Sequence, residues 1–429
     1  MTGEAPRQEQ YSSDGDDHRG ALEVLGPGLV TGAADDDPSG IGTYSQVGAQ
    51  FGYNLTWALL FSLPLMAAIQ EICARIGAST GLGIAQNLKE HYPRSLLRIV
   101  VLLLLVANVI NLGADLGAMG AAFALIVPGP VLPATIAFGL ISILLEIFVS
   151  YERYANVLKW ATLSLFSYFA VVVLAQVDWP AAIKGTLVPG FAFDSDHVMA
   201  LVAVLGTTIS PYLFFWQSAQ EVEEQHRRHT KPLMVSPRSA GKELRRIRTD
   251  TLIGMTFSNL TAIVIVIATA ATLHVAGVTQ ISSSVEAATA LRPLAGELAF
   301  ALFAIGIIST GLLAVPILAG SVAYAIAEMF GWREGLNRAP REAKAFYAVI
   351  ALATCAGIAM NFSDINPMRA LYWSAVVNGL LAPPLMVVTM LIASNRRIMG
   401  NLVVSRGLAF GGWLSTAVMT AVAVLFLVI

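Results

Sequence analysis

The chain has 429 residues, 56% of them hydrophobic and 13% charged, and its mean hydropathy is +0.68. Soluble domains of this length carry about a quarter charged residues. The composition therefore predicts an all-α membrane protein and excludes an ordinary soluble domain. The formal net charge of −2 includes no visible basic domain, so we expect no nucleic-acid partner.

Residues 1–20 are polar and lack the apolar core of a cleavable signal peptide, which favours a disordered cytosolic tail. A membrane-spanning helix needs about 20 mostly apolar residues, and eleven segments meet this condition. They are, approximately, 22–50 (interrupted), 55–76, 97–124, 131–149, 157–177, 197–218 (interrupted), 250–273, 295–327, 345–361, 366–393 and 407–429.

The basic residues predict the orientation of these segments. With a cytosolic N-terminus, 23 of the 26 Lys and Arg residues fall in cytosolic connections and flanks, and the outside receives Lys184, Arg292 and Arg369. Cytosolic loops of membrane proteins carry this excess of positive charge. One missed span would invert every later loop, so the strong asymmetry supports eleven spans, with the C-terminus at the outer face.

The first segment contains the stretch GAADDDPSGIG at residues 32–42. Pro38 interrupts the helix and the glycines loosen it. Asp35, Asp36 and Asp37 bring three carboxylates to membrane depth, where each ionised acid costs roughly 2.5–3.5 kcal/mol. Such acids need a cation or water to remain ionised, so the break is a candidate cation site.

The sixth segment has a corresponding break at Pro211, in VLGTTISPYLFFWQ. Two breaks that open two successive blocks of five segments are typical of an inverted-repeat transporter, whose site lies between the breaks. We expect a core over 21–394, with one repeat at about 21–177 and the other at about 196–394. Residues 395–429 supply an additional transmembrane helix.

Successive helical residues point about 100° apart, so the three aspartates cannot all face one point. Asp37, beside the proline, is the principal predicted metal ligand, and Asp36 is the next candidate. The alternative places Asp35 and Asp36 in a water-filled vestibule, where they do not touch the ion.

The chain resembles the Nramp family of divalent-metal transporters from about residue 24 to its end. The resemblance rests on both breaks together with EICARIGASTG (71–81) and GADLGAMGAA (113–122). It implies the LeuT-type fold of five plus five helices, with helices one and six broken. In the first segment, Asp37 and Pro38 match the family pattern Asp-Pro-Gly-Asn, whereas Ser39 and Gly40 replace its Gly and Asn.

In the sixth segment, Ser210 stands where the family has a Met ligand, and Tyr212 stands where it has a His. The carbonyl that joins the family's site would here belong to Thr207. In LYWSAVVNGLL of segment ten, Ala375 occupies the position where many members carry a Gln ligand. The resemblance thus implies a metal site of Asp37, Ser210 and Thr207, with Asp36 and Gly40 beside it.

The substitutions favour a hard ion. Loss of the thioether removes a soft ligand that selects manganese, iron and later metals, and loss of the Asn amide leaves more room. Mg²⁺ keeps several waters and is held by one or two carboxylates. We expect a magnesium-preferring transporter that also passes Mn²⁺ across the plasma membrane, with no resident cofactor and no obligate protein partner besides the ion and the bilayer.

Proton coupling is expected to be weak or absent. Asp115 matches an acid of the family's third segment, but Ala118 and Asn108 stand where the family has Glu, and Tyr212 removes the His. Asp35, Asp115 and Tyr212 remain as candidates for a vestibule or a relay.

Several alternatives stay open. They are a proton-coupled Mn²⁺/Fe²⁺ transporter, a LeuT-fold transporter of a small cationic organic substrate, and a sensor that binds metal without transporting it. An enzyme is not expected, because the sequence has no HExxH motif, no GxSxG motif and no intramembrane histidine.

Overall fold

The computed structural model describes residues 26–149, 165–336, 338–363 and 365–429, with 294, 295 and 297 described by their backbone alone. The predicted tail at 1–20, the start of the first segment and residues 157–164 of the fifth lie outside this range. The described residues form helices and no strand.

Nearly all of the predicted segments correspond to described helices in the same order. The helices are α1 (Pro27–Asp35), α2 (Pro38–Phe51), α3 (Thr56–Thr80), α4 (Ile84–His91), α5 (Arg94–Phe123), α6 (Val131–Phe148), α8 (Phe166–Leu174), α9 (Trp179–Leu187), α10 (Ser195–Thr208), α11 (Pro211–Arg227), α12 (Ala240–Thr269), α13 (Ser284–Thr289), α14 (Arg292–Ala295), α15 (Ala299–Phe330), α16 (Lys344–Met360), α17 (Pro367–Ala393), α18 (Arg396–Met399) and α19 (Arg406–Val428).

Eight described helices are long and apolar enough to cross a membrane, with α10 and α11 taken as one. The apolar α16, with 17 residues, is shorter. The interrupted first segment is divided between two short helices of 9 and 14 residues, and the described part of the fifth segment forms α8. These differences account for the gap between eight and the eleven expected spans.

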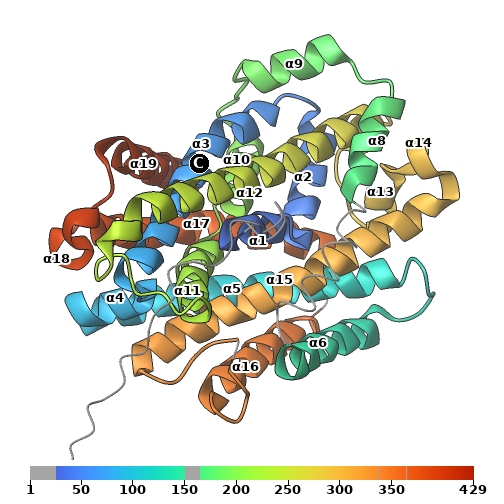
Figure 1. The fold of residues 1–429 in the computed structure, drawn as a ribbon. Coiled ribbons are helices and arrows are strands. Elements are labelled where there is room, and N and C mark those ends of the chain that lie inside the picture. The colour runs from blue at the N-terminus through green and yellow to red at the C-terminus, as the bar shows by residue number, and fades with distance from the viewer. Residues whose placement is uncertain (1–25, 150–164, 337, 364) are drawn as a thin grey trace, which may run out of the picture.

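The broken helices occupy the interior of the molecule. Figure 1 shows α1, α2, α10 and α11 among the longer α3, α5, α12, α15 and α17. One close approach joins α1 to α12, where a Cβ added to Gly32 would lie 2.4 Å from the Gly254 carbonyl oxygen. Glycine at both positions lets the two backbones touch.

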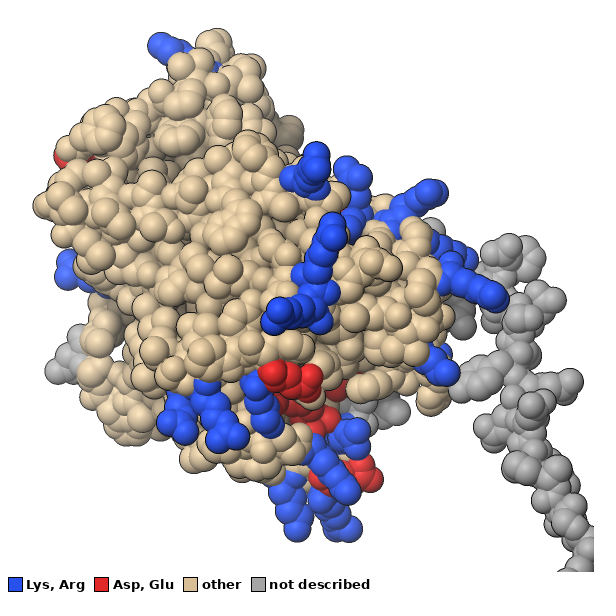
Figure 2. Space-filling model, turned by 90° about the vertical axis from the view of Figure 1, so that its left-hand side faces the viewer, with Lys and Arg blue, Asp and Glu red and all other residues tan. Residues whose placement is uncertain are grey.

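The connection after the sixth segment is shorter than the polar stretch 219–249 suggests. Helix α11 continues to Arg227, and α12 begins at Ala240 after a 3₁₀ turn at Pro237–Ser239. Charged residues in these helical turns hide the apolar pattern of a membrane helix. Figure 2 views the molecule from the side of α4 and α18, and Lys and Arg side chains are spread across much of this face.

Candidate metal site at the two helix breaks

Asp37 lies at the first break and caps the helix that follows it. The backbone of Asp37 is extended, and its Oδ1 accepts a 2.7 Å hydrogen bond from the Gly40 N–H. Aspartate is a favoured N-cap because its side chain satisfies a free N–H of the first turn. The DPSG sequence therefore ends one helix, starts the next and turns a carboxylate toward the break.

Side chains from two other helices hold the second oxygen of Asp37. Asn111 of α5 donates to Oδ2 at 2.9 Å, and the Tyr212 hydroxyl of α11 lies 3.2 Å from Oδ2 and 3.2 Å from the Ala34 carbonyl. Asn111 in turn accepts from Asn378 of α17 at 3.2 Å. Two carboxylate oxygens offer about four lone-pair sites, so these three donors leave Asp37 room to bind a cation.

Asp115 also reaches the first break. Its Oδ1 accepts from the Ser39 N–H at 3.1 Å, and its Oδ2 lies 3.3 Å from Asn111 Nδ2. The Ser39 hydroxyl donates to the Leu371 carbonyl at 3.0 Å and lies 2.8 Å from the Ser374 hydroxyl. Asp115 and Ser39 thus join α2 to α5 and α17 directly behind Asp37.

Asp35 and Asp36 face a different helix. The Ser258 hydroxyl of α12 lies 2.6 Å from Asp35 Oδ2 and 3.3 Å from Asp36 Oδ1. Both aspartates are buried in the described structure, and Oδ1 of Asp35 has no hydrogen-bond partner. The two acids therefore lie beside the break and not on the Asn111 side of Asp37.

At the second break, Ser210 and Thr207 present oxygen atoms, and neither residue contains sulfur. Ser210 precedes Pro211 at the start of α11, and its hydroxyl donates to the Gly206 carbonyl at 3.0 Å and the Thr207 carbonyl at 2.7 Å. The Ser210 proton is thereby directed at α10. The hydroxyl oxygen and the second lone pair of the Thr207 carbonyl remain available to an ion or its water.

Gly40 contradicts one expectation from the sequence, because loss of the Asn side chain leaves no added room. A Cβ at Gly40 would lie 3.1 Å from the Asp35 carbonyl oxygen, 3.3 Å from Thr207 Oγ1 and 3.3 Å from Tyr44 Cε2. Tyr44 and Thr207 fill the space that a larger residue would need. Gly40 instead permits the two broken helices to approach each other.

The carboxylates do not form a cage by themselves. No group of three His, Cys, Asp or Glu side chains in the described part of the chain is arranged to hold a metal ion. Hydroxyl, carbonyl and amide oxygens would therefore complete a coordination sphere around Asp37. Oxygen ligands of this kind suit magnesium, calcium and manganese.

Sequence reasoning missed Asn111, Ser258 and Asn378. Asn111 lies one helical turn before Asp115, and that spacing is the one local signal of a shared face. Ser258 and Asn378 reach the breaks from α12 and α17, so no local pattern reveals them. Ala375 is buried against Gly206 of α10, where a Cβ on the glycine would lie 2.1 Å from the Ala375 carbonyl oxygen.

Comparison with known proteins identifies the same family that the sequence motifs resemble. The profile of the Nramp family, described as natural resistance-associated macrophage protein-like, matches residues 28–429. The chain is 25% identical over 410 residues to the divalent metal cation transporter MntH of Klebsiella pneumoniae (strain 342). This alignment covers 93% of the chain and 92% of the relative.

Two solved structures share the fold. A manganese transporter of Eremococcus coleocola, in complex with an aromatic bis-isothiourea compound, has a TM-score of 0.74 at 19% identity, covering 94% of this chain and 85% of that one. Mhp1, a nucleobase-cation-symport-1 transporter in a closed conformation, has a TM-score of 0.57 at 14% identity, covering 94% and 91% of the two chains.

Proposed function

This chain belongs to the Nramp family of divalent metal cation transporters, and on that premise we propose that it prefers Mg²⁺ and also carries Mn²⁺. The observation that carries the proposal is the chemistry at the two breaks. Asp37 supplies charge, and Ser210 and Thr207 supply hydroxyl and carbonyl oxygens. A site without a thioether loses its preference for soft metals.

The hydrogen bonds to Asp37 support binding of an ion that keeps part of its water. Gly40, Asn111 and Tyr212 fix the carboxylate in one orientation while leaving it partly unoccupied. Mg²⁺ dehydrates reluctantly and is bound through few carboxylates and several waters. In this arrangement Asp36 and Asp35, oriented by Ser258, hold those waters from the α12 side.

The transport cycle we propose is alternating access in an eleven-span, LeuT-type protein of the plasma membrane. Repeat one covers about 21–177 and repeat two about 196–394, with 395–429 as an added span. The positive charge of the connections supports a cytosolic N-terminus and an extracytosolic C-terminus. Pro38, Ser39 and Pro211 maintain the breaks around which the repeats move.

Weak or absent proton coupling follows from the missing acids. Ala118 has no titratable group, and Asn108 donates to the Leu318 carbonyl at 2.9 Å and the Ser321 hydroxyl at 2.6 Å. An amide that joins α5 to α15 cannot carry a proton as a carboxylate does. Asp115 is the remaining acid of this helix, and its hydrogen bonds to Ser39 and Asn111 favour a positioning role.

Mn²⁺ uptake into liposomes, measured with and without competing Mg²⁺, tests the proposal. We expect excess Mg²⁺ to suppress Mn²⁺ uptake by the unmodified protein, and Asp37→Ala to lower uptake by about tenfold or more. Cys355→Ser, an exposed position in α16, is the matched control. Mn²⁺ uptake that resists excess Mg²⁺ and acidifies the lumen would favour a proton-coupled Mn²⁺/Fe²⁺ transporter.

The other candidate functions give different outcomes. Uptake of an organic cation that competes with metal would favour a LeuT-fold transporter of cationic substrates. Metal binding without flux would identify a sensor. Full uptake by Asp37→Ala would refute the site itself.

A further inference from the structure

The first turn of α1 is capped by a residue from another helix. Asp250 of α12 accepts from the N–H groups of Gly26 at 3.0 Å, Gly28 at 2.7 Å and Leu29 at 3.2 Å. Helix α1 has no capping side chain of its own. Its free N–H groups carry a partial positive charge that favours an anion, so one carboxylate fixes the start of α1 to α12.

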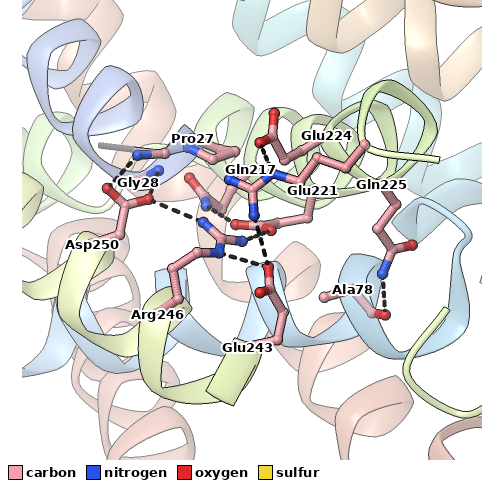
Figure 3. Close-up of polar contacts among 12 residues, drawn as sticks. Pro27, Gly28, Ala78, Gln217, Glu221, Glu224, Gln225, Glu243, Arg246 and Asp250 are labelled. Atoms are coloured by element: carbon pink, nitrogen blue, oxygen red, sulfur yellow. Dashed lines mark hydrogen bonds and ion pairs between the residues drawn. The ribbon is translucent and has the colours of Figure 1, made fainter. Parts of the chain in front are cut away.

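Arg246 connects this cap to the second broken helix. It lies one turn before Asp250, and its Nη2 contacts Glu221 Oε2 of α11 at 2.6 Å. Its Nε contacts Glu243 at 2.6 Å, and its Nη1 lies 3.8 Å from Asp250 Oδ2. Figure 3 shows the guanidinium between Glu221, Glu243 and Asp250, with α1 behind Asp250.

A second contact joins the same two broken helices. The Thr31 hydroxyl of α1 donates to the Gln217 side-chain oxygen of α11, and Gln217 Nε2 lies 3.4 Å from Glu221. Further along α11, Gln225 donates to the Ala78 carbonyl of α3 at 2.6 Å. Four helices therefore meet through polar contacts at one end of the molecule.

Burial makes these contacts costly to break. The side chains of Glu221, Asp250 and Arg246 are 2%, 3% and 12% exposed. Exposed ion pairs contribute little, whereas removal of one partner from a buried pair leaves an uncompensated charge. The Arg246–Glu221 pair joins α12 to α11, and the Asp250 cap joins α12 to α1, so these helices can separate only if the charges become hydrated.

The position of the cluster relative to Asp37 suggests its role. Helix α1 runs from the capped Gly28 to Asp35, next to the ion site, and α11 runs from Ser210 at the site to Glu221 and beyond. The cluster thus closes the ends of both half-helices that lead away from the site. In the proposed orientation this is the cytosolic side.

We propose that Glu221, Arg246 and Asp250 form a cytosolic gate in which Arg246 is the positioning residue, and that the gate opens when the cation leaves the site. Release of Arg246 from Glu221 frees α11, and loss of the Asp250 cap frees α1. The exposed carboxylates then face the departing cation. This gate does not depend on which divalent ion is carried.

Hydrogen–deuterium exchange of the full-length protein in detergent tests the gate. Hydrogen bonds to charged groups are worth about 1.5–3 kcal/mol, so Glu221→Gln and Arg246→Gln should speed exchange in peptides from α1 by about tenfold or more. Glu71→Gln is the matched control, because its 2.5 Å ion pair with Arg75 lies within α3 and joins no second helix. Exchange in α1 should then stay within about twofold of the unmodified protein.

The pattern along the chain separates gating from general instability. A gate predicts faster exchange confined to α1, α11 and the first turns of α12, with α15 unchanged. If Arg246→Gln does not fold, Glu221→Gln and Asp250→Asn decide the question, since each leaves Arg246 with another carboxylate. Unchanged α1 exchange in both variants would overturn the gate, whatever the outcome of the ion competition.

Discussion

Asp37 is held in place before any ion arrives. A buried carboxylate that accepts from a backbone N–H, an amide and a hydroxyl is fixed in one orientation. The residues that donate to Asp37 therefore influence the affinity of the site without contacting the ion.

Asn111 is the donor whose removal is easiest to interpret. Asn111→Ala should lower uptake by about 10- to 100-fold, the usual loss when a residue that orients a metal ligand is removed. The apparent KM should rise more than the maximal rate falls, because the folded site remains. Asn108→Ala on the same helix lacks contact with Asp37 and is the control. Equal losses in both variants would indicate a general packing defect.

Ser210 tests the basis of ion preference. Ser210→Met restores a thioether, so Cd²⁺ or Mn²⁺ should displace Mg²⁺ about tenfold more effectively than in the unmodified protein. Ser210→Ala removes the hydroxyl without adding sulfur and should not produce this shift. The measurement is inhibition of labelled Mn²⁺ uptake by each unlabelled metal. The quantity compared between variants is the inhibition by Cd²⁺ or Mn²⁺ relative to that by Mg²⁺. An equal shift in Ala and Met variants would mean that the hydroxyl, and not the absence of sulfur, sets the preference.

The residues that the sequence reveals are those with a local signal. Proline after Asp37 and after Ser210 marks each break directly in the chain. Asn111 and Ser258 carry no such signal, because their contacts with the aspartates span 74 and about 222 residues and depend on helix packing. Arg246 and Asp250 belong to a charged stretch that resembles an ordinary cytosolic connector until α12 is seen to begin at Ala240.

At the scale of helices, α1 and α12 pack backbone against backbone. Gly32→Ala places a methyl group 2.4 Å from the Gly254 carbonyl. Overpacking of this kind costs about 1–3 kcal/mol, so the thermal midpoint should fall.

Gly241 provides the contrast for this substitution, since nothing lies within 4 Å of a Cβ added there. Gly241→Ala near the start of α12 should raise stability by about 0.4–1 kcal/mol by restricting the unfolded chain. Thermal unfolding of both variants measures the difference. A Gly32→Ala protein as stable as Gly241→Ala would show that α1 can shift away from α12 at little cost.

The connection between α15 and α16 has a pH-sensitive carboxyl group. Burial, followed by the charges of Glu328 and Glu223, raises the pKa of Glu334 from 4.5 to about 9. The folded protein holds this proton more tightly than the unfolded chain does. Its stabilising contribution is therefore present at low pH and is lost as the pH rises from 4.5 through about 9.

Glu334→Gln removes that titration. The variant should be no more stable than the unmodified protein in acid and increasingly more stable as the pH approaches about 9. Thermal midpoints measured across this range test the sign. Glu342→Gln, an exposed position in the same connection, is the control. A parallel pH dependence in Glu334→Gln and the unmodified protein would contradict the assignment.

For the whole molecule, the sequence predicted the fold well because membrane insertion imposes simple rules. Long apolar runs mark spans, and Lys and Arg mark the cytosolic side. The short α1 and α2 are harder to count as spans by length alone, because the break divides their apolar run, and α16 is unbroken but has 17 residues. The packing of the other helices around the breaks depends on contacts between distant segments.

The uncoupled transport that we propose predicts an electrical property of the whole protein. A divalent ion that crosses without a counter-moving proton carries two charges, so an inside-negative potential of about 100 mV supplies about 4.6 kcal/mol. This energy corresponds to accumulation of roughly 2,000-fold at equilibrium.

Liposomes given a potassium diffusion potential should therefore accumulate Mn²⁺ and Mg²⁺ strongly, without a change in luminal pH. Collapse of the potential should abolish accumulation, whereas a pH gradient alone should not drive it. The proposed positioning role of Asp115, whose carboxylate accepts from the Ser39 N–H, predicts that Asp115→Asn retains this voltage dependence. Metal uptake that acidifies the lumen in unmodified protein, and ceases to do so in Asp115→Asn, would instead establish Asp115 as a proton carrier.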